Sequence, residues 1–229
     1  MRFDAVLFDC DGVLVDSEPI TNGVWRDMLS EQGWEMSLAE CMRLFVGKSF
    51  KDEAALIAAK TGRPFSMDWL AAFWARRNTA LEQHLQAIPH IHLAIERIHA
   101  DFAGRIACAS GADRFKVVLE LRKVGLMPYF DGRIFSGEEM PRSKPFPDVY
   151  LAAAAALGAD PRCCAVVEDT VTGIAAGVAA GCTVFGYCPA SAGDSAALAL
   201  RDAGASVVFN DMVDLPALLL AEFALAGLA

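Results

Sequence analysis

Positive charge is scarce in this sequence. Its 229 residues include 20 lysines and arginines against 29 aspartates and glutamates, which gives a net charge of −9 at pH 7. Proteins that bind nucleic acid favour basic surfaces, so we expect no nucleic-acid partner. An acidic protein that binds an anionic small molecule needs a local positive centre, which a lysine, an arginine or a metal ion can supply.

Signals for secretion, membrane insertion and disulfide formation are also lacking. Asp4, Asp9 and Asp11 interrupt any apolar stretch near the amino terminus, so we expect no signal peptide. The apolar tail at residues 218–223 is too short to span a bilayer. The seven cysteines form neither a metal-binding spacing nor an even set, which favours buried thiols in a reducing compartment. We therefore expect a cytoplasmic protein without membrane contact, either a monomer or a homodimer.

Apolar residues are plentiful, at 55% of the chain, and can build a substantial core. From residue 104 onward, short apolar runs alternate with helical stretches, a pattern typical of βα units and a parallel sheet. The expected strands are residues 5–8, 105–109, 133–135, 165–167, 183–185 and 206–209. The expected helices of this α/β part are residues 112–124, 148–157, 171–180, 194–203 and 213–226.

The region between residues 18 and 86 contains no strand-like run and predicts helices instead. Ile20, Val24 and Met28 recur at helical spacing. Residues 49–52 resemble a capping box, and Ser66 opens a further helix. The apolar stripe of that last helix would consist of Leu70, Phe73, Trp74, Leu81 and Leu85.

The chain is therefore expected to form two domains. Residues 1–16 and 87–229 would build the α/β core, and residues 17–86 would form a helical domain inserted near its start.

Two aspartates directly follow the first expected strand, in the segment Asp9-Cys10-Asp11-Gly12-Val13. Carboxylates at positions i and i+2 lie on one face of an extended chain, so they can share one pocket. One can then attack an electrophile while the other handles protons. Gly12 lets the chain turn away without a side chain that would crowd a ligand.

Polar residues also follow other expected strands. Ser110-Gly111 ends the second strand in the chain, Glu168-Asp169 ends the fourth, and Lys144 lies in the loop before that strand. Ligands bind outside the carboxyl ends of the strands in an open parallel sheet, so these segments are expected to converge with Asp9 and Asp11.

Each of these later segments has an ordinary structural explanation. Ser110 could cap a helix, Glu168-Asp169 could cap the next one, and Lys144 could be a plain loop residue. Asp9 and Asp11 are harder to dismiss, because adjacent carboxylates repel each other unless a cation or a proton lies between them. Asp169 would add a third carboxylate, and such a set favours Mg²⁺, which prefers carboxylates, water and a substrate phosphate as ligands.

With these residues in place, the chain resembles the haloacid dehalogenase (HAD) superfamily, in its phosphatase branch. Asp9-x-Asp11-Gly12-Val13-Leu14, Ser110, Lys144 in Ser-Lys-Pro-x-Pro-Asp, and Glu168-Asp169 match the four superfamily motifs in order. The resemblance is strongest to the β-phosphoglucomutase-like and 6-phosphogluconate phosphatase-like group. It implies a Rossmann-like parallel-sheet core with an inserted α-helical cap domain of the C1 type.

The resemblance also implies roles. Asp9 would attack phosphorus and form an aspartyl-phosphate, and Asp11 would serve as acid and then as base. Mg²⁺ would be held by Asp9, by the backbone carbonyl of Asp11 and by Asp169, with Glu168 supporting it. Ser110, Gly111 and Lys144 would hold the phosphoryl group, and Lys144 would also restrain Asp9. The substrate would be a small phosphate ester, such as a sugar phosphate, which Glu18, Lys48 and Arg77 would contact from the cap.

Several alternatives share parts of this pattern. A phosphoglycolate phosphatase remains open. A β-phosphoglucomutase-type phosphomutase would have a histidine and an arginine where this chain has Thr21 and Phe50. A dehalogenase needs no second acid, and a response-regulator receiver is much shorter and lacks the helical insertion. A catalytically inactive scaffold is disfavoured because every key position is filled.

Overall fold

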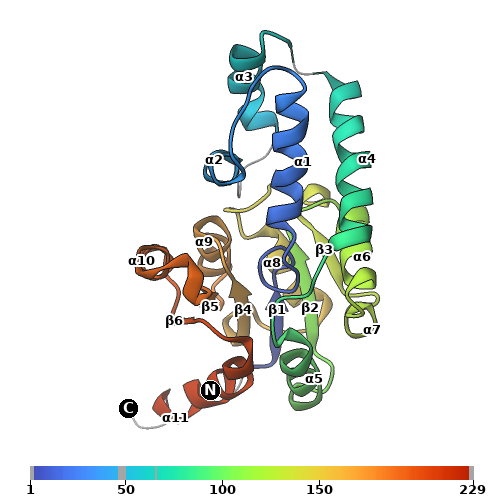
Figure 1. Ribbon diagram of the computed structural model, residues 1–229. Coiled ribbons are helices and arrows are strands. Elements are labelled where there is room, and N and C mark those ends of the chain that lie inside the picture. The colour runs from blue at the N-terminus through green and yellow to red at the C-terminus, as the bar shows by residue number, and fades with distance from the viewer. Residues whose placement is uncertain (1–2, 46–49, 65, 227–229) are drawn as a thin grey trace. The chain divides into compact units, whose positions relative to one another are not determined.

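The computed structural model describes residues 3–45, 50–64 and 66–226, whose elements are labelled in Figure 1. The chain divides into two compact units. One unit consists of Met1–Val15 together with Ala87–Ala229, and the other of Asp16–Gln86.

The first unit is built on a six-stranded sheet with the order β3-β2-β1-β4-β5-β6, in which every neighbouring pair is parallel. The parallel α/β fold expected from the sequence is thus confirmed, and the strand ends differ from the expected ones by two residues or fewer. The strands are β1 Ala5–Phe8, β2 Ile106–Ser110, β3 Ile134–Ser136, β4 Cys164–Glu168, β5 Thr183–Tyr187 and β6 Val207–Phe209.

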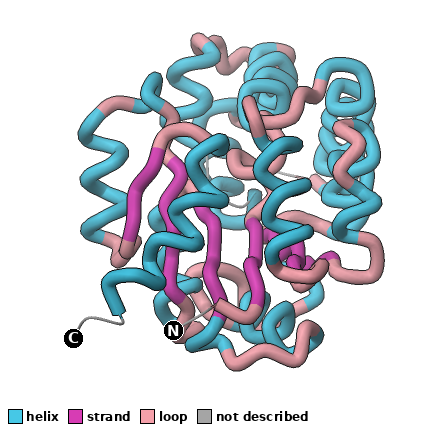
Figure 2. Tube along the Cα trace, turned by 90° about the horizontal axis from the view of Figure 1, so that it is seen from below, coloured by secondary structure: helices cyan, strands magenta, loops and turns pink. Residues whose placement is uncertain are grey.

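Helices cover both faces of this sheet, as Figure 2 shows. Five agree with the expected segments: α6 Arg114–Lys123, α8 Asp148–Ala156, α9 Val171–Ala179, α10 Asp194–Asp202 and α11 Leu215–Ala226. Two were not expected, α5 Ile91–Asp101 and the short α7 Met127–Phe130. Short 3₁₀ turns complete the unit: Gly137–Glu139, Pro161–Cys163, Ala190–Ala192 and Met212–Asp214.

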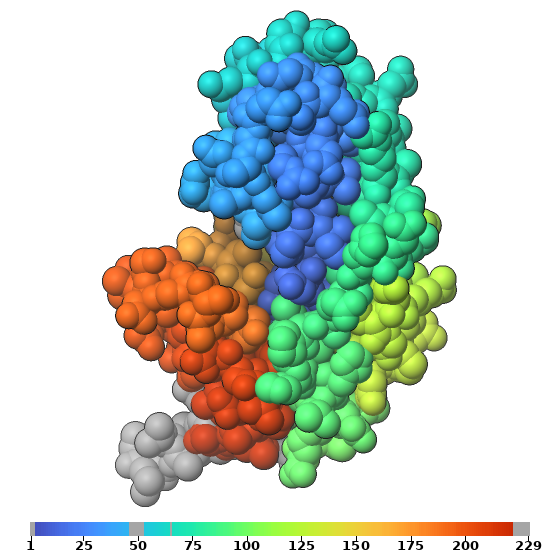
Figure 3. Space-filling view, viewed as in Figure 1, coloured from blue at the N-terminus to red at the C-terminus, as the bar shows by residue number. Residues whose placement is uncertain are grey.

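Successive side chains of a strand point to opposite faces of the sheet, so their contacts show which helices cover each face. Leu7 and Val166 belong to a buried cluster that includes Tyr150 of α8 and Ile174 of α9. Phe8 points to the opposite face, where its ring lies 6.1 Å from that of Phe130 in α7. Helix α11 packs against α5, and the two lie side by side on the surface in Figure 3 (red and green).

The strand order reverses at β1. The chain passes from β1 to β2 on one side and later returns to β4 on the other side. In the register of the sheet, Phe8 lies beside Cys108 of β2 and Val167 of β4. The carboxyl ends of these three strands therefore meet at the kind of switch point where open parallel sheets bind ligands.

The second unit is helical, with α1 Glu18–Ser30, α2 Leu38–Phe45, α3 Phe50–Thr61 and α4 Met67–His84. Its core is aromatic. Trp25 stacks on Phe45 with ring centres 4.8 Å apart, and Phe73 lies 5.2 Å from Trp25. The Ser66 side chain caps α4 by accepting a hydrogen bond from the backbone N–H of Trp69, as its position at the helix start predicts.

Details of the helical pattern differ from the expectation. In α1 the buried apolar face is formed by Trp25, Met28 and Leu29, whereas Ile20 and Val24 are only partly buried, and Val24 packs against the edge of this cluster. Trp74, expected in the buried stripe of α4, is 38% exposed.

Ser49, the first residue of the expected capping box, lies outside the described residues. No helix in the described ranges has both the length and the apolar character required to cross a bilayer.

Candidate active site

A buried lysine joins two of the expected site segments. The Lys144 ammonium donates to Asp9 Oδ1 and to Glu168 Oε1, each at 2.7 Å, and its side chain is 9% exposed. Asp9 follows β1, Glu168 ends β4, and Lys144 comes from the loop between β3 and α8. The ordinary explanation of Lys144 as a plain loop residue is therefore wrong.

Glu168 is fully buried, and both of its carboxylate oxygens accept hydrogen bonds. Tyr150 donates its hydroxyl to Oε1 at 3.0 Å. The backbone N–H groups of Asp169 and Thr170 and the Thr170 hydroxyl all donate to Oε2. Burial alone would raise the pKa of Glu168, but Lys144 and the Thr170 hydrogen bonds hold it below its usual value. Glu168 is thus an ionised anchor for the lysine.

Asp9 has a different electrostatic environment. Its backbone N–H donates to the Val167 carbonyl at 3.0 Å, which extends the pairing of β1 with β4 by one step. Burial raises the pKa of Asp9 to about 7; Lys144 opposes this shift, while Glu168 and Asp11 add to it. A further positive charge beside Asp9 would favour the carboxylate form.

The donor set fits a hard divalent cation. Carboxylate oxygens of Asp9, Glu168 and Asp169 lie within 4.8 Å of one another. Because the oxygens of Glu168 are already engaged, Asp9 and Asp169 are the better direct ligands. Gly12, at a φ of +79°, lies so close to Asp169 that a Cβ atom there would come within 2.0 Å of Asp169 Oδ2. The loop that carries Asp11 therefore packs against this carboxylate, and such oxygen donors suit Mg²⁺.

Asp11 belongs to a second charged cluster that the sequence reading missed. Its carboxylate contacts the ammonium of Lys116 in α6, and Lys116 also lies 2.7 Å from Glu120 Oε1. The Cys10 thiol donates to Glu120 Oε2 at 3.5 Å. The sequence does contain a signal for this ion pair, because Lys116 and Glu120 are four residues apart, on one face of a helix, among apolar neighbours.

Ser110 and Gly111 follow the strand next to β1. Ser110 is the last residue of β2 and is buried, and its hydroxyl oxygen accepts from the backbone N–H of Ala112 at 3.0 Å. The side chain that caps α6 belongs to Asp113, so the explanation of Ser110 as a helix cap is wrong. Likewise, the cap of α9 is Thr170 rather than Glu168 or Asp169.

The expected substrate contacts of the helical unit stay predictions. Glu18 is the first residue of α1 and accepts a hydrogen bond from Asn22 at 2.7 Å. Arg77 is buried in α4; its guanidinium donates to the Asn78 side chain and lies over the Phe73 ring. Lys48 lies outside the described residues.

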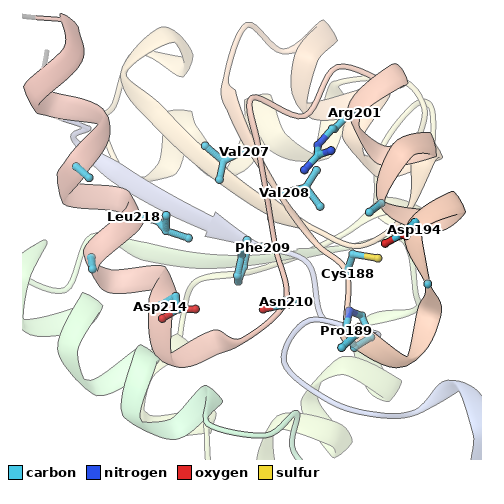
Figure 4. A pocket seen from close by; sticks show the side chains of 15 residues that line it. Cys188, Pro189, Asp194, Arg201, Val207, Val208, Phe209, Asn210, Asp214 and Leu218 are labelled. Atoms are coloured by element: carbon cyan, nitrogen blue, oxygen red, sulfur yellow. The ribbon is translucent and has the colours of Figure 1, made fainter.

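A cavity of about 630 Å³ lies apart from these residues, along β6 between α10 and α11 (Figure 4). Apolar side chains such as Val207, Phe209 and Leu218 line it together with Asp194 and Arg201. None of the expected site residues of the core belongs to its lining. Asp9, Ser110 and Glu168 lie instead at the carboxyl ends of β1, β2 and β4.

Comparisons with known proteins identify relatives of this chain. The model of the family described as haloacid dehalogenase-like hydrolase matches residues 3–181. The chain is 28% identical over 188 residues to 6-phosphogluconate phosphatase of Escherichia coli K12, covering 82% of this chain and 83% of that protein. It is 32% identical over 196 residues to hexitol phosphatase A of the same organism, covering 81% and 83%.

A solved structure is similar over nearly its whole length. A HAD family hydrolase from Deinococcus radiodurans, with bound phosphate and sodium, superposes with a TM-score of 0.79 at 37% identity. The match covers 98% of this chain and 97% of that one.

Gly173 offers a test of the packing around Glu168. A Cβ atom at this position of α9 would lie 1.6 Å from Glu168 Oε1, and Glu168 is held by five hydrogen bonds. We expect Gly173→Ala to lower the free energy of unfolding by about 2 kcal/mol or more, measured by urea denaturation.

The matched control is Gly23→Ala in α1, where a Cβ atom would meet nothing within 4 Å. This substitution should instead raise stability by about 0.5–1 kcal/mol, because alanine favours a helix interior over glycine. A Gly173→Ala protein as stable as the wild type would show that Glu168 is not held as described.

Proposed function

The chain belongs to the haloacid dehalogenase-like hydrolase family, and from this premise we propose that it is a magnesium-dependent phosphatase of small sugar phosphates or sugar-acid phosphates. The observation that carries the proposal is the bridge of Lys144 between Asp9 and Glu168, with Asp169 beside it. The names of the relatives, 6-phosphogluconate phosphatase and hexitol phosphatase A, support the substrate class.

Asp9 is the proposed nucleophile. Its carboxylate attacks phosphorus, an aspartyl-phosphate forms as the bond to the ester oxygen breaks, and water then hydrolyses this intermediate. The attack requires the ionised form, which Lys144 favours against the burial that raises the pKa of Asp9 to about 7. Held by Asp9, by Asp169 and by the Asp11 backbone carbonyl, Mg²⁺ would supply positive charge that neutralises the transferring group.

Asp11 is the proposed acid and base. Its protonated carboxyl donates to the departing alcohol oxygen, and the resulting carboxylate then accepts a proton from the water that attacks the intermediate. The spacing of two residues between Asp9 and Asp11 allows one loop to present both groups to the same phosphoryl centre.

The remaining core residues bind the phosphoryl oxygens in this proposal. Ser110 has a hydroxyl to donate, Gly111 a backbone N–H, and Lys144 an ammonium that already restrains Asp9. Each is a hydrogen-bond donor, as a group that stabilises growing negative charge must be.

The helical unit is proposed to select the leaving group, with Glu18, Lys48 and Arg77 as its contacts. We do not propose a phosphomutase, because Thr21 and Phe50 stand where that group would have a histidine and an arginine.

The role of Asp9 can be tested by Asp9→Asn, which keeps the shape but removes the nucleophilic carboxylate. With a chromogenic phosphomonoester and Mg²⁺, we expect kcat to fall on the order of 10⁴-fold or more. Asp131→Asn, at an exposed position after α7, is the matched control and should retain the wild-type rate. Turnover retained by Asp9→Asn would remove Asp9 from this role.

Metal removal is the second test. EDTA should abolish hydrolysis and excess Mg²⁺ should restore it, because the transferring group would lose the positive charge of the metal while Lys144 stays paired with Asp9 and Glu168. As a readout besides activity, Mg²⁺ should raise the melting temperature of the wild type but not that of Asp169→Asn. Hydrolysis that survives chelation would remove the metal from the proposal.

A further inference from the structure

Lys116 is a second buried lysine at this edge of the sheet, and none of the roles above uses it. It lies in the first turn of α6 and is 5% exposed. Its ammonium contacts Asp11 Oδ1 and lies 2.7 Å from Glu120 Oε1. The side chain of Asp11 is more open than those of its partners, at 21% against 6% for Lys116 and 0% for Glu120. The lysine thus contacts Asp11 from the protein interior.

The lysine has little freedom to move. The Asp113 side chain caps α6 by accepting from the backbone N–H of Lys116 at 2.8 Å, and Glu120 binds the ammonium one turn further along the same helix. Burial would lower the pKa of Lys116, but Asp11 and Glu120 outweigh it, so the group stays charged.

Burial raises the pKa of Glu120 to about 8, and Asp11 adds to this shift, so Glu120 balances the buried ammonium only in part. The ammonium also contacts Asp11, 105 residues away in the chain. The backbone around Asp11 is already set by its own turn, in which Gly12 N–H donates to Val15 and Leu14 N–H donates to Cys10. The contact with Lys116 acts on the side chain instead, and constrains the direction of the Asp11 carboxyl group.

We propose that Lys116 is a positioning residue, which holds the Asp11 carboxyl group in the orientation required for proton transfer to and from the reacting oxygens. This inference rests on the proposed phosphatase function. Lys116 itself gains and loses no proton. Asp11 gives its proton to the ester oxygen as the P–O bond breaks and the bond from Asp9 to phosphorus forms. It takes one from water as the water oxygen bonds to phosphorus and the bond to Asp9 breaks.

A positioning role makes a specific prediction about leaving groups. Phenol is a poor leaving group and needs a proton as it departs, whereas 2,4-dinitrophenol leaves readily as its anion. The two phenyl phosphates present similar rings to the protein. Removal of Lys116 should therefore slow the release of phenol much more than the release of dinitrophenol, while a general loss of structure would slow both alike.

The experiment compares Lys116→Met with the wild type in single-turnover release of the phenol from phenyl phosphate and from 2,4-dinitrophenyl phosphate, with Mg²⁺. We expect the loss to be at least on the order of tenfold greater for phenyl phosphate. In an Asp11→Asn background, adding Lys116→Met should cause no further loss, because the lysine acts through Asp11. Lys116→Arg should recover part of the lost rate.

Lys116→Met leaves two carboxylates without their cation, so the double variant Lys116→Met/Glu120→Gln provides a second measurement with less buried charge. It should show the same selective loss. Equal losses on both esters, or an additional loss in the Asp11→Asn background, would overturn the positioning role while the phosphatase proposal stands. A wild-type protein that hydrolyses neither these esters nor any small sugar phosphate in the presence of Mg²⁺ would overturn both.

Discussion

The ion pair of Lys144 with Asp9 and Glu168 is the interaction on which the site depends. It connects groups 135 and 24 residues apart in the chain, from two strands and one loop. Buried carboxylates at a sheet edge are costly unless cations offset them. The compact ammonium of a lysine can serve two carboxylates at once. Four further hydrogen bonds hold Glu168, and the proposal therefore assigns the reactive role to Asp9.

The sheet and the main site residues could be predicted from the sequence because they follow from local pattern and one topological rule. Short apolar runs between helical segments indicate a parallel sheet, and the carboxyl ends of parallel strands lie along one edge. Polar residues that directly follow such runs must then lie there, as Asp9, Ser110 and Glu168 do. The location of Lys144 was expected from its place between two strands, and its restraint of Asp9 was implied by the resemblance. Its simultaneous contact with Glu168 is what the structure adds.

Residues on helices were harder to predict, because their contribution depends on which helical face meets the sheet. Tyr150 lies in an alanine-rich helix whose pattern gives no preferred face, yet its hydroxyl reaches Glu168. Lys116 and Glu120 were missed because charged residues on helices are ordinarily exposed. Helix α5 is the exception, because Ile91, Ala94, Ile95 and Ile98 recur at helical spacing and are all buried.

The central claim, that Asp9 carries the phosphoryl group during turnover, is tested most directly by locating that group on the protein. Asp11→Asn should slow hydrolysis of the intermediate, so this variant can be mixed with 2,4-dinitrophenyl phosphate and Mg²⁺ and quenched in acid. Mass spectrometry of its peptides should place the phosphoryl group on Asp9. A phosphoryl group on another residue, or dinitrophenol release with none on the protein, would contradict the claim.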